Sequence, residues 1–90
     1  MFLKVATYPQ QYNTVKTMIV NPIRGIVVVE FTYGNVFEYR RVSRRAILNL
    51  LATLDMDTEH WVRLNCVHNL TTEQIDLTFY TSEQLRAMAA

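Results

Sequence analysis

The chain has few of the residues that form catalytic loops, disulfide scaffolds and nucleotide cradles. It contains two glycines, two prolines and one cysteine among 90 residues. With Gly25 and Gly34 as the only glycines, a glycine-rich loop around a phosphate is nearly excluded. No HExxH, GxSxG or paired-carboxylate motif occurs either. Cys66 has no partner for an internal disulfide, which fits a reducing compartment, so we expect a cytoplasmic protein.

The sequence also lacks long apolar runs. Its start, MFLKVATYPQQY, has neither the basic residues nor the uninterrupted apolar run of a signal peptide. No apolar stretch approaches the roughly 20 residues that span a bilayer, so we expect no membrane partner. Half of the residues are apolar or aromatic, which argues against a disordered chain. We therefore expect a single folded domain over residues 1–90.

Net charge is only +1, but the two signs are unevenly distributed. Residues 1–45 carry seven Lys or Arg and two Glu, a balance of +5, whereas residues 46–90 carry two Arg and six acidic residues, a balance of −4. This polarity favours one basic and one acidic surface, and with them oriented docking or head-to-tail self-association. Folding can instead mix the charges on a solvated surface, and both interpretations stay open.

Alternating apolar and polar residues predict a small antiparallel sheet. Turn residues run from Asn21-Pro22 to Gly25, between two such alternating segments. Trp61, in a short apolar segment over residues 60–64, is the largest candidate for the core. Ser82 can cap a final helix. Besides the central hairpin, the expected elements are strands at 2–6, 15–20 and 75–80 and a last helix at 84–88.

Residues 26–54 have the pattern of a β-hairpin that leads directly into an amphipathic helix. A two-residue Gly34-Asn35 loop would mix apolar and charged groups on one face. A three-residue loop, or a five-residue loop of the same parity, avoids this mixture. Either loop gives an apolar face formed by Val29, Phe31, Phe37 and Tyr39. The three-residue loop, which we prefer, also places Glu30 opposite Glu38.

The helix is expected from Arg44 to Leu54, with Ser43 as its cap. Its apolar stripe should cover the aromatic face of the sheet and consists of Ala46, Ile47, Leu50, Leu51 and Leu54. Leu48 lies outside this stripe and is the candidate for contact with a protein partner. The predicted fold class is α+β: an antiparallel sheet of three or four strands with this helix packed on one face, completed by a C-terminal strand and helix.

The hairpin and helix also carry a spaced motif, FxxGxxFxYxxV, formed by Phe31, Gly34, Phe37, Tyr39 and Val42. The motif resembles the KTSC domain, a short module named for the C-terminus of some lysyl-tRNA synthetases and also found as a free-standing small protein. The likeness covers about residues 14–63, although Ser43 replaces the family's proline and the Ser-x-Gly after the helix is missing. The resemblance implies a β-hairpin packed against a helix and a loosely defined link to RNA or translation, with no catalytic residues to carry over.

The strongest functional candidate is the basic segment at the end of the hairpin, which contains Tyr39, Arg40, Arg41, Arg44 and Arg45. Guanidinium groups bind phosphate oxygens in pairs, and an adjacent aromatic ring can stack on an unpaired base. The last two arginines also stand at a helix N-terminus, where positive charge is unfavourable unless an anion lies nearby. Three interpretations stay open: nucleic acid, an acidic protein surface, or pairing with internal carboxylates such as Glu30 and Glu38.

Two other groups of residues have better structural explanations. His60, Cys66 and His68, with Asp57 and Glu59 nearby, do not match a zinc site, which needs four ligands in paired short loops. On a strand, the Cβ atoms of Cys66 and His68 would lie about 7 Å apart, and no orienting acid is evident. We expect a buried thiol, an exposed imidazole, and neither a metal nor a cofactor.

Taken together, these patterns favour a small non-catalytic interaction module that binds a protein partner or a second copy of itself. The polarised charge, a hairpin edge that can pair with another chain, and Leu48 motivate this hypothesis. The alternative is binding of RNA or single-stranded nucleic acid through the arginines and Tyr39. An enzyme is the class with the least support in the sequence.

Overall fold

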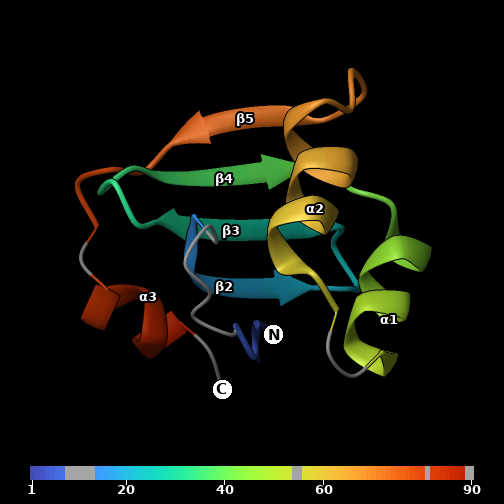
Figure 1. The fold of residues 1–90 in the computed structure, drawn as a ribbon, viewed down its shortest axis with the longest axis horizontal. Helices are drawn as coiled ribbons and strands as arrows, with labels where there is room; N and C mark the ends of the chain where they lie inside the picture. Colours follow the sequence, from blue (N-terminus) through green and yellow to red (C-terminus); the bar gives the residue numbers. More distant parts are fainter. Residues whose placement is uncertain (8–13, 54–55, 81, 89–90) are drawn as a thin grey trace.

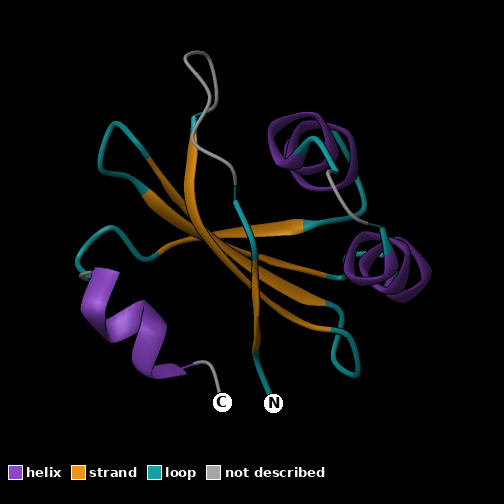
Figure 2. Cartoon of the chain, turned by 60° about the horizontal axis from the view of Figure 1, so that its bottom comes forward, coloured by secondary structure: helices purple, strands orange, loops and turns teal. Residues whose placement is uncertain are grey.

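The computed structural model describes residues 1–7, 14–53, 56–80 and 82–88. They form a five-stranded antiparallel sheet with short helices on both of its faces (Figures 1 and 2). The order of the strands in the sheet follows their order in the sequence. The strands are β1 (Leu3–Val5), β2 (Val15–Asn21), β3 (Ile26–Phe31), β4 (Val36–Arg40) and β5 (Glu73–Asp76). The predicted α+β class is confirmed, but the sheet has five strands rather than three or four.

Helices α1 (Arg44–Ala52) and α2 (Thr58–Val62) lie on one side of the sheet, and α3 (Ser82–Met88) lies on the other (Figure 2). A π-helical turn, η1 (Arg63–Val67), continues α2 directly. The predicted cap of α1 is confirmed, because the Ser43 hydroxyl accepts a hydrogen bond from the Ala46 amide at 3.2 Å. No helix formed by the described residues is long and apolar enough to cross a bilayer.

The larger core lies between the sheet and helices α1 and α2. Its buried residues include Val29, Phe31, Tyr39, Ile47, Leu50, Trp61, Val62 and Cys66, with Phe37 packed against them at partial exposure. The predicted aromatic face of the hairpin is therefore confirmed. Ile47 and Leu50 of α1 pack in the same core as predicted, but Leu51 was placed wrongly in the stripe, because it is 38% exposed. Leu54, the last predicted residue of the stripe, lies outside the described residues. The Trp61 indole nitrogen donates a hydrogen bond to the Ala46 carbonyl at 3.2 Å, which ties α2 to α1.

The β3–β4 hairpin has the longer of the two predicted loops. Glu30 pairs with Val36 across the strands, so five residues, 31–35, connect them. The expected pairing of Glu30 with Glu38 was wrong, because the two-residue shift places Glu38 opposite Val28. This register keeps the same faces and separates the two carboxylates, which would repel each other as direct partners.

The second face of the sheet has a smaller core beneath α3. Its buried members are Ile19, Val28, Val36 and Leu85, and Phe2, Ile26, Leu77, Tyr80 and Met88 pack around them. The sequence pattern had predicted one buried face only. The four consecutive apolar residues 26–29 are explained by this second core, because a strand covered on both sides is apolar at every position.

The C-terminal strand is shorter and begins earlier than predicted. It covers Glu73–Asp76, whereas a strand was expected over residues 75–80. The Asp76 carboxylate accepts hydrogen bonds from the amide of Thr78, at 2.8 Å, and from its hydroxyl, so the chain turns there instead of continuing the ladder. Helix α3 then begins at Ser82. The side chain of Ser82, the predicted cap, lies outside what the structure describes.

Candidate functional site

A groove lies where the β2–β3 turn meets the loop between β4 and α1. The turn is held by Asn21, whose buried side-chain carbonyl accepts a hydrogen bond from the Arg24 amide at 3.1 Å. Gly25 ends it with φ +69°, and a Cβ at this position would lie 2.8 Å from the Val42 carbonyl oxygen. The Val42 amide donates to the Gly25 carbonyl at 2.9 Å. Only glycine satisfies both the backbone angle and this close approach.

Four arginines line this groove, which has a volume of about 820 Å³. The β2–β3 turn supplies one of them, and the first turn of α1 supplies another. The other two are the last residue of β4 and the residue that follows it. The four are Arg24, Arg40, Arg41 and Arg44, and we call the site the arginine groove. Ile23 and Glu73 line it as well. Among the described residues, the site therefore combines four positive side chains with a single carboxylate.

Among the described residues, only one of these four guanidinium groups has a carboxylate partner. The Nε atom of Arg40 lies 2.7 Å from the buried carboxylate of Glu38. The side chains of Arg24, Arg41 and Arg44 make no hydrogen bond or ion pair within the described part of the chain. Within the described residues, internal pairing, one of the three interpretations of the arginine cluster, thus accounts for Arg40 but for none of the other groove arginines.

The backbone conformation around the arginine groove adds to its positive charge. Arg41 has φ 63°, a left-handed conformation that costs a residue with a side chain about 1–2 kcal/mol. Such strain is frequent at functional sites. Arg44 and Arg45 begin α1, whose first turn contains no acidic residue. The partial positive charge of the helix N-terminus therefore adds to the charge of the arginines instead of being neutralised.

The structure brings together three of the four arginines that the sequence analysis selected. Arg45 is exposed on α1 but does not line the groove. Arg24, which was not predicted from the sequence, joins from the β2–β3 turn. The predicted turn could have indicated Arg24, since an arginine next to Gly25 in a turn must lie at an end of the sheet. Leu48, the candidate contact residue, is 56% exposed and lies one helical turn after Arg44.

Tyr39 is separated from the arginines by the sheet itself. Successive side chains of a strand point to opposite faces, and Tyr39 belongs to the core beneath the helices while Arg40 lines the groove. Its side chain is only 2% exposed. This placement corrects the idea that Tyr39 stacks on a base held by the arginines.

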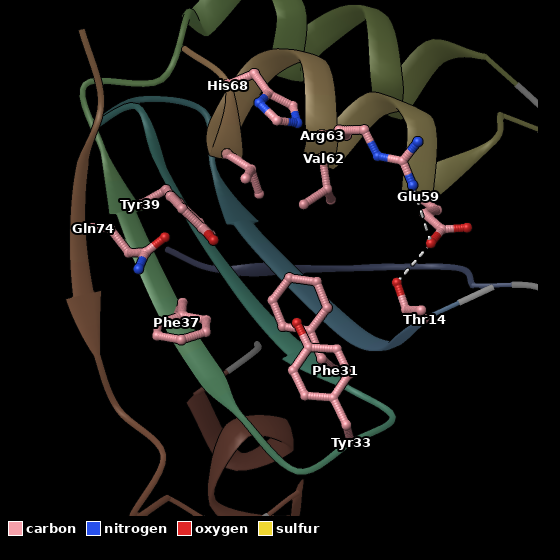
Figure 3. A pocket seen from close by; sticks show the side chains of 11 residues that line it. Thr14, Phe31, Tyr33, Phe37, Tyr39, Glu59, Val62, Arg63, His68 and Gln74 are labelled. Atoms are coloured by element: carbon pink, nitrogen blue, oxygen red, sulfur yellow. Dashed lines mark hydrogen bonds and ion pairs between the residues drawn. The ribbon is translucent and has the colours of Figure 1, made fainter. Parts of the chain in front are cut away.

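Tyr39 instead lines a second site, a pocket of about 380 Å³ between the sheet and the helical layer (Figure 3). Four aromatic residues of the hairpin form one wall: Phe31, Tyr33, Phe37 and Tyr39. Val62 and Val67 face them from α2 and η1. We call this site the aromatic pocket. It is apolar where the arginine groove is charged.

Polar side chains surround the mouth of the aromatic pocket. The Thr14 hydroxyl donates a hydrogen bond to Glu59 at 2.8 Å, and an Nη atom of Arg63 lies 3.5 Å from the same carboxylate oxygen (Figure 3). This network links the chain just before β2 to helix α2. Gln74 of β5 and His68, after η1, complete the rim.

Cys66 is buried beneath this pocket wall without lining it. Burial raises the pKa of its thiol to about 12, so the group is protonated at neutral pH. The predicted buried thiol and exposed imidazole of His68 are confirmed. Among the described residues, no three potential metal ligands lie close enough to hold an ion.

Comparisons with family models, with curated proteins and with solved structures found no match for this chain. The resemblance to the KTSC domain therefore stays a prediction that depends on its motif residues. The structure places three of these, Phe31, Phe37 and Tyr39, in one wall of the aromatic pocket. Gly34 has φ +100° in the hairpin loop, and Val42 holds the turn at Gly25. Function must be argued from the geometry of the two sites.

Proposed function

We propose that this protein is a small non-catalytic interaction module that binds an acidic segment of a protein partner in the arginine groove. One observation carries the proposal: three guanidinium groups that have no partner among the described residues line one groove, beside one described carboxylate. Arginine is well suited to this role, because its planar group can bind a carboxylate through two parallel hydrogen bonds.

Exposed apolar side chains next to the arginines favour a protein over a nucleic acid. Ile23 lines the groove with 74% of its side chain exposed. Leu48 and Leu51 follow Arg44 by one and two helical turns and are exposed as well. A segment with both carboxylates and apolar residues can pair with the arginines and cover these side chains. None of the described residues that line the groove is aromatic, so bases would find no stacking partner there.

The proposal is tested by fluorescence anisotropy with two labelled probes of equal charge. One is a peptide of alternating Glu and Leu residues, and the other is a short single-stranded oligouridine. We expect the peptide to bind more tightly, to weaken as salt is added, and to lose affinity when its leucines are replaced by serine. Tighter binding of the oligouridine, with a salt slope near −3 for about four phosphate contacts, would instead establish the nucleic-acid alternative.

Matched charge variants assign the binding to the groove. The double variant Arg41→Gln/Arg44→Gln removes two groove charges and should weaken peptide binding about five- to tenfold. Arg45→Gln removes a charge from the same helix turn outside the groove, and it should change the affinity less than about twofold. A loss of binding free energy in Arg45→Gln that is half the loss in the double variant would show that only net charge matters, because it removes one charge instead of two. No binding of either probe at low salt would refute the proposal.

A second copy of the chain is the other protein partner to be tested. Light scattering of the pure protein at low salt should give a monomer if the acidic segment belongs to a different protein. A dimer that dissociates with salt, and that the double arginine variant abolishes, would identify the partner as the protein itself.

A further inference from the structure

The aromatic pocket contains a polar group, the Tyr39 hydroxyl, to which no described residue is hydrogen-bonded. The Tyr39 side chain is 98% buried, since only 2% of it is exposed, and its hydroxyl makes no hydrogen bond with any described residue. Figure 3 shows the hydroxyl end pointing into the space between Val62 and Phe31. Because Tyr39 lines the pocket, a ligand there can take the hydrogen bond that this hydroxyl offers.

The hydroxyl can act only as a neutral hydrogen-bond group at physiological pH. Burial raises the pKa of Tyr39 to about 12, with smaller contributions from Cys66 and Tyr33. The proton therefore stays on the oxygen, and the group can donate a hydrogen bond to an acceptor in the pocket. An anion between the aromatic and valine walls is disfavoured, because these walls are apolar.

The walls of the pocket suit a flat ring. Phe31 and Phe37 meet edge to face, with ring centroids 6.1 Å apart, and Phe37 and Tyr39 lie 6.4 Å apart at a tilt of 53°. Two valines close the opposite side. Tyr33 is stacked on Phe31 at 5.2 Å and lies exposed at the mouth. Rings of this kind bind another aromatic ring by offset stacking or edge contacts.

We propose that the aromatic pocket binds a small planar ring compound whose acceptor atom, an amide carbonyl or a ring nitrogen, takes the hydrogen bond of Tyr39. The volume of about 380 Å³ is at the lower end of the range for small-molecule sites, about 300–1,000 Å³. The Gln74 amide at the rim can contact a polar substituent that remains outside. Because Gln74 lines the pocket and Glu73 lines the arginine groove, the two sites lie on opposite faces of β5.

The test is a titration followed in amide ¹H–¹⁵N spectra with benzamide, nicotinamide and toluene. The first two carry an acceptor on a planar ring, and toluene is a ring of similar size without one. We expect benzamide and nicotinamide to shift the signals of residues around the pocket, and toluene to bind more weakly. Absence of any shift at these residues up to millimolar concentrations would overturn the proposal.

Three variants locate the ligand and test the hydrogen bond. Tyr39→Phe should weaken benzamide binding about three- to tenfold, the effect of one hydrogen bond, without lowering the thermal midpoint of unfolding. In Val67→Trp, the indole ring should fill the pocket from the side on which the exposed Val67 lies, and benzamide binding should be abolished. Leu64→Trp is the matched control, since Leu64 is exposed on the same π-helical turn and does not line the pocket.

Equal affinity of Tyr39→Phe and the unchanged protein for benzamide would refute the assigned hydrogen bond. Binding that survives Val67→Trp would refute the assigned pocket. Neither result would affect peptide binding in the arginine groove, because the two sites share no lining residue.

Discussion

The arginine groove and the aromatic pocket lie on opposite faces of the same two strands. Tyr39 and Gln74 line the pocket, while their neighbours Arg40 and Glu73 line the groove. The groove is charged and open to solvent, so its interactions are screened by salt. The walls of the pocket are mainly apolar, and the Tyr39 hydroxyl acts only on a ligand in direct contact. Neighbouring residues of one strand thus belong to two different kinds of binding site.

The two faces also differ in what they contribute to stability. The residues around the pocket belong to the main core, whereas the groove contains exposed arginines and a strained backbone position at Arg41. Substitutions on the helical side should therefore change stability first. Substitutions in the groove should mainly change the affinity for the peptide, except at positions where the backbone conformation depends on the residue.

The largest expected difference is between two adjacent residues of α1. Ile47 is fully buried on the pocket side, so Ile47→Ala should lower the free energy of unfolding by about 2–4 kcal/mol through lost burial and a cavity. Leu48 is 56% exposed one helical turn after Arg44, and Leu48→Ala should change the free energy of unfolding by less than about 0.5 kcal/mol while weakening binding of the Glu/Leu peptide. Urea unfolding of both variants gives the comparison, and equal destabilisation would contradict the assignment of the two faces.

The glycines give the next largest effect. Gly25→Ala should destabilise the protein by about 2–3 kcal/mol, because the new Cβ would lie 2.8 Å from the Val42 carbonyl oxygen in addition to the backbone strain. Gly34→Ala adds only strain, since a Cβ there would meet nothing within 4 Å, and it should cost about 1–2 kcal/mol. Urea unfolding distinguishes them. A larger loss at Gly34 would show that the turn is not held against Val42.

Alkaline pH should affect the pocket side of the molecule. The folded pKa of Tyr39, about 12, lies above its usual value of 10.0, so the folded state retains a proton that the unfolded state loses. Stability is therefore fully present below pH 10 and falls as the pH rises from 10 towards 12, by about 1 kcal/mol at pH 11. Tyr39→Phe should reduce this decline in urea unfolding at pH 9 to 11. The decline should not vanish, because the pKa of Cys66 is raised as well.

Arg41→Gly should separate binding from stability in the groove. Glycine adopts a φ of 63° without a steric penalty, so the variant should gain about 0.5–1 kcal/mol in stability. It should bind the Glu/Leu peptide about threefold more weakly, because it loses a charge. Thermal unfolding and anisotropy measure the two effects. A loss of stability would show that the Arg41 side chain makes contacts that support the fold.

The hairpin, its apolar face, the Ser43 cap and most of the strand positions could be predicted from the sequence, because they depend on local alternation and turn chemistry. The same alternation already placed Tyr39 and Arg40 on opposite faces, which argues against a joint site for them. The loop length could not be decided in this way, since both candidate loops have the same parity.

The two sites themselves depend on contacts between distant parts of the chain. Arg24 reaches the other arginines because Gly25 packs against Val42, and the pocket forms because α2 and η1 lie over the hairpin. The second core beneath α3 likewise depends on a C-terminal helix that contacts β2. No short pattern in the sequence encodes such distances.

Mapping the bound Glu/Leu peptide on the protein's amide ¹H–¹⁵N spectrum tests the proposed function most directly. We predict that the signals of Arg24, Gly25, Arg41, Val42 and Arg44 shift, and that those of the aromatic pocket stay in place. Shifts concentrated around Tyr33, Phe37 and Val67, with the groove unchanged, would contradict the proposal that this protein holds its partner through the arginine groove.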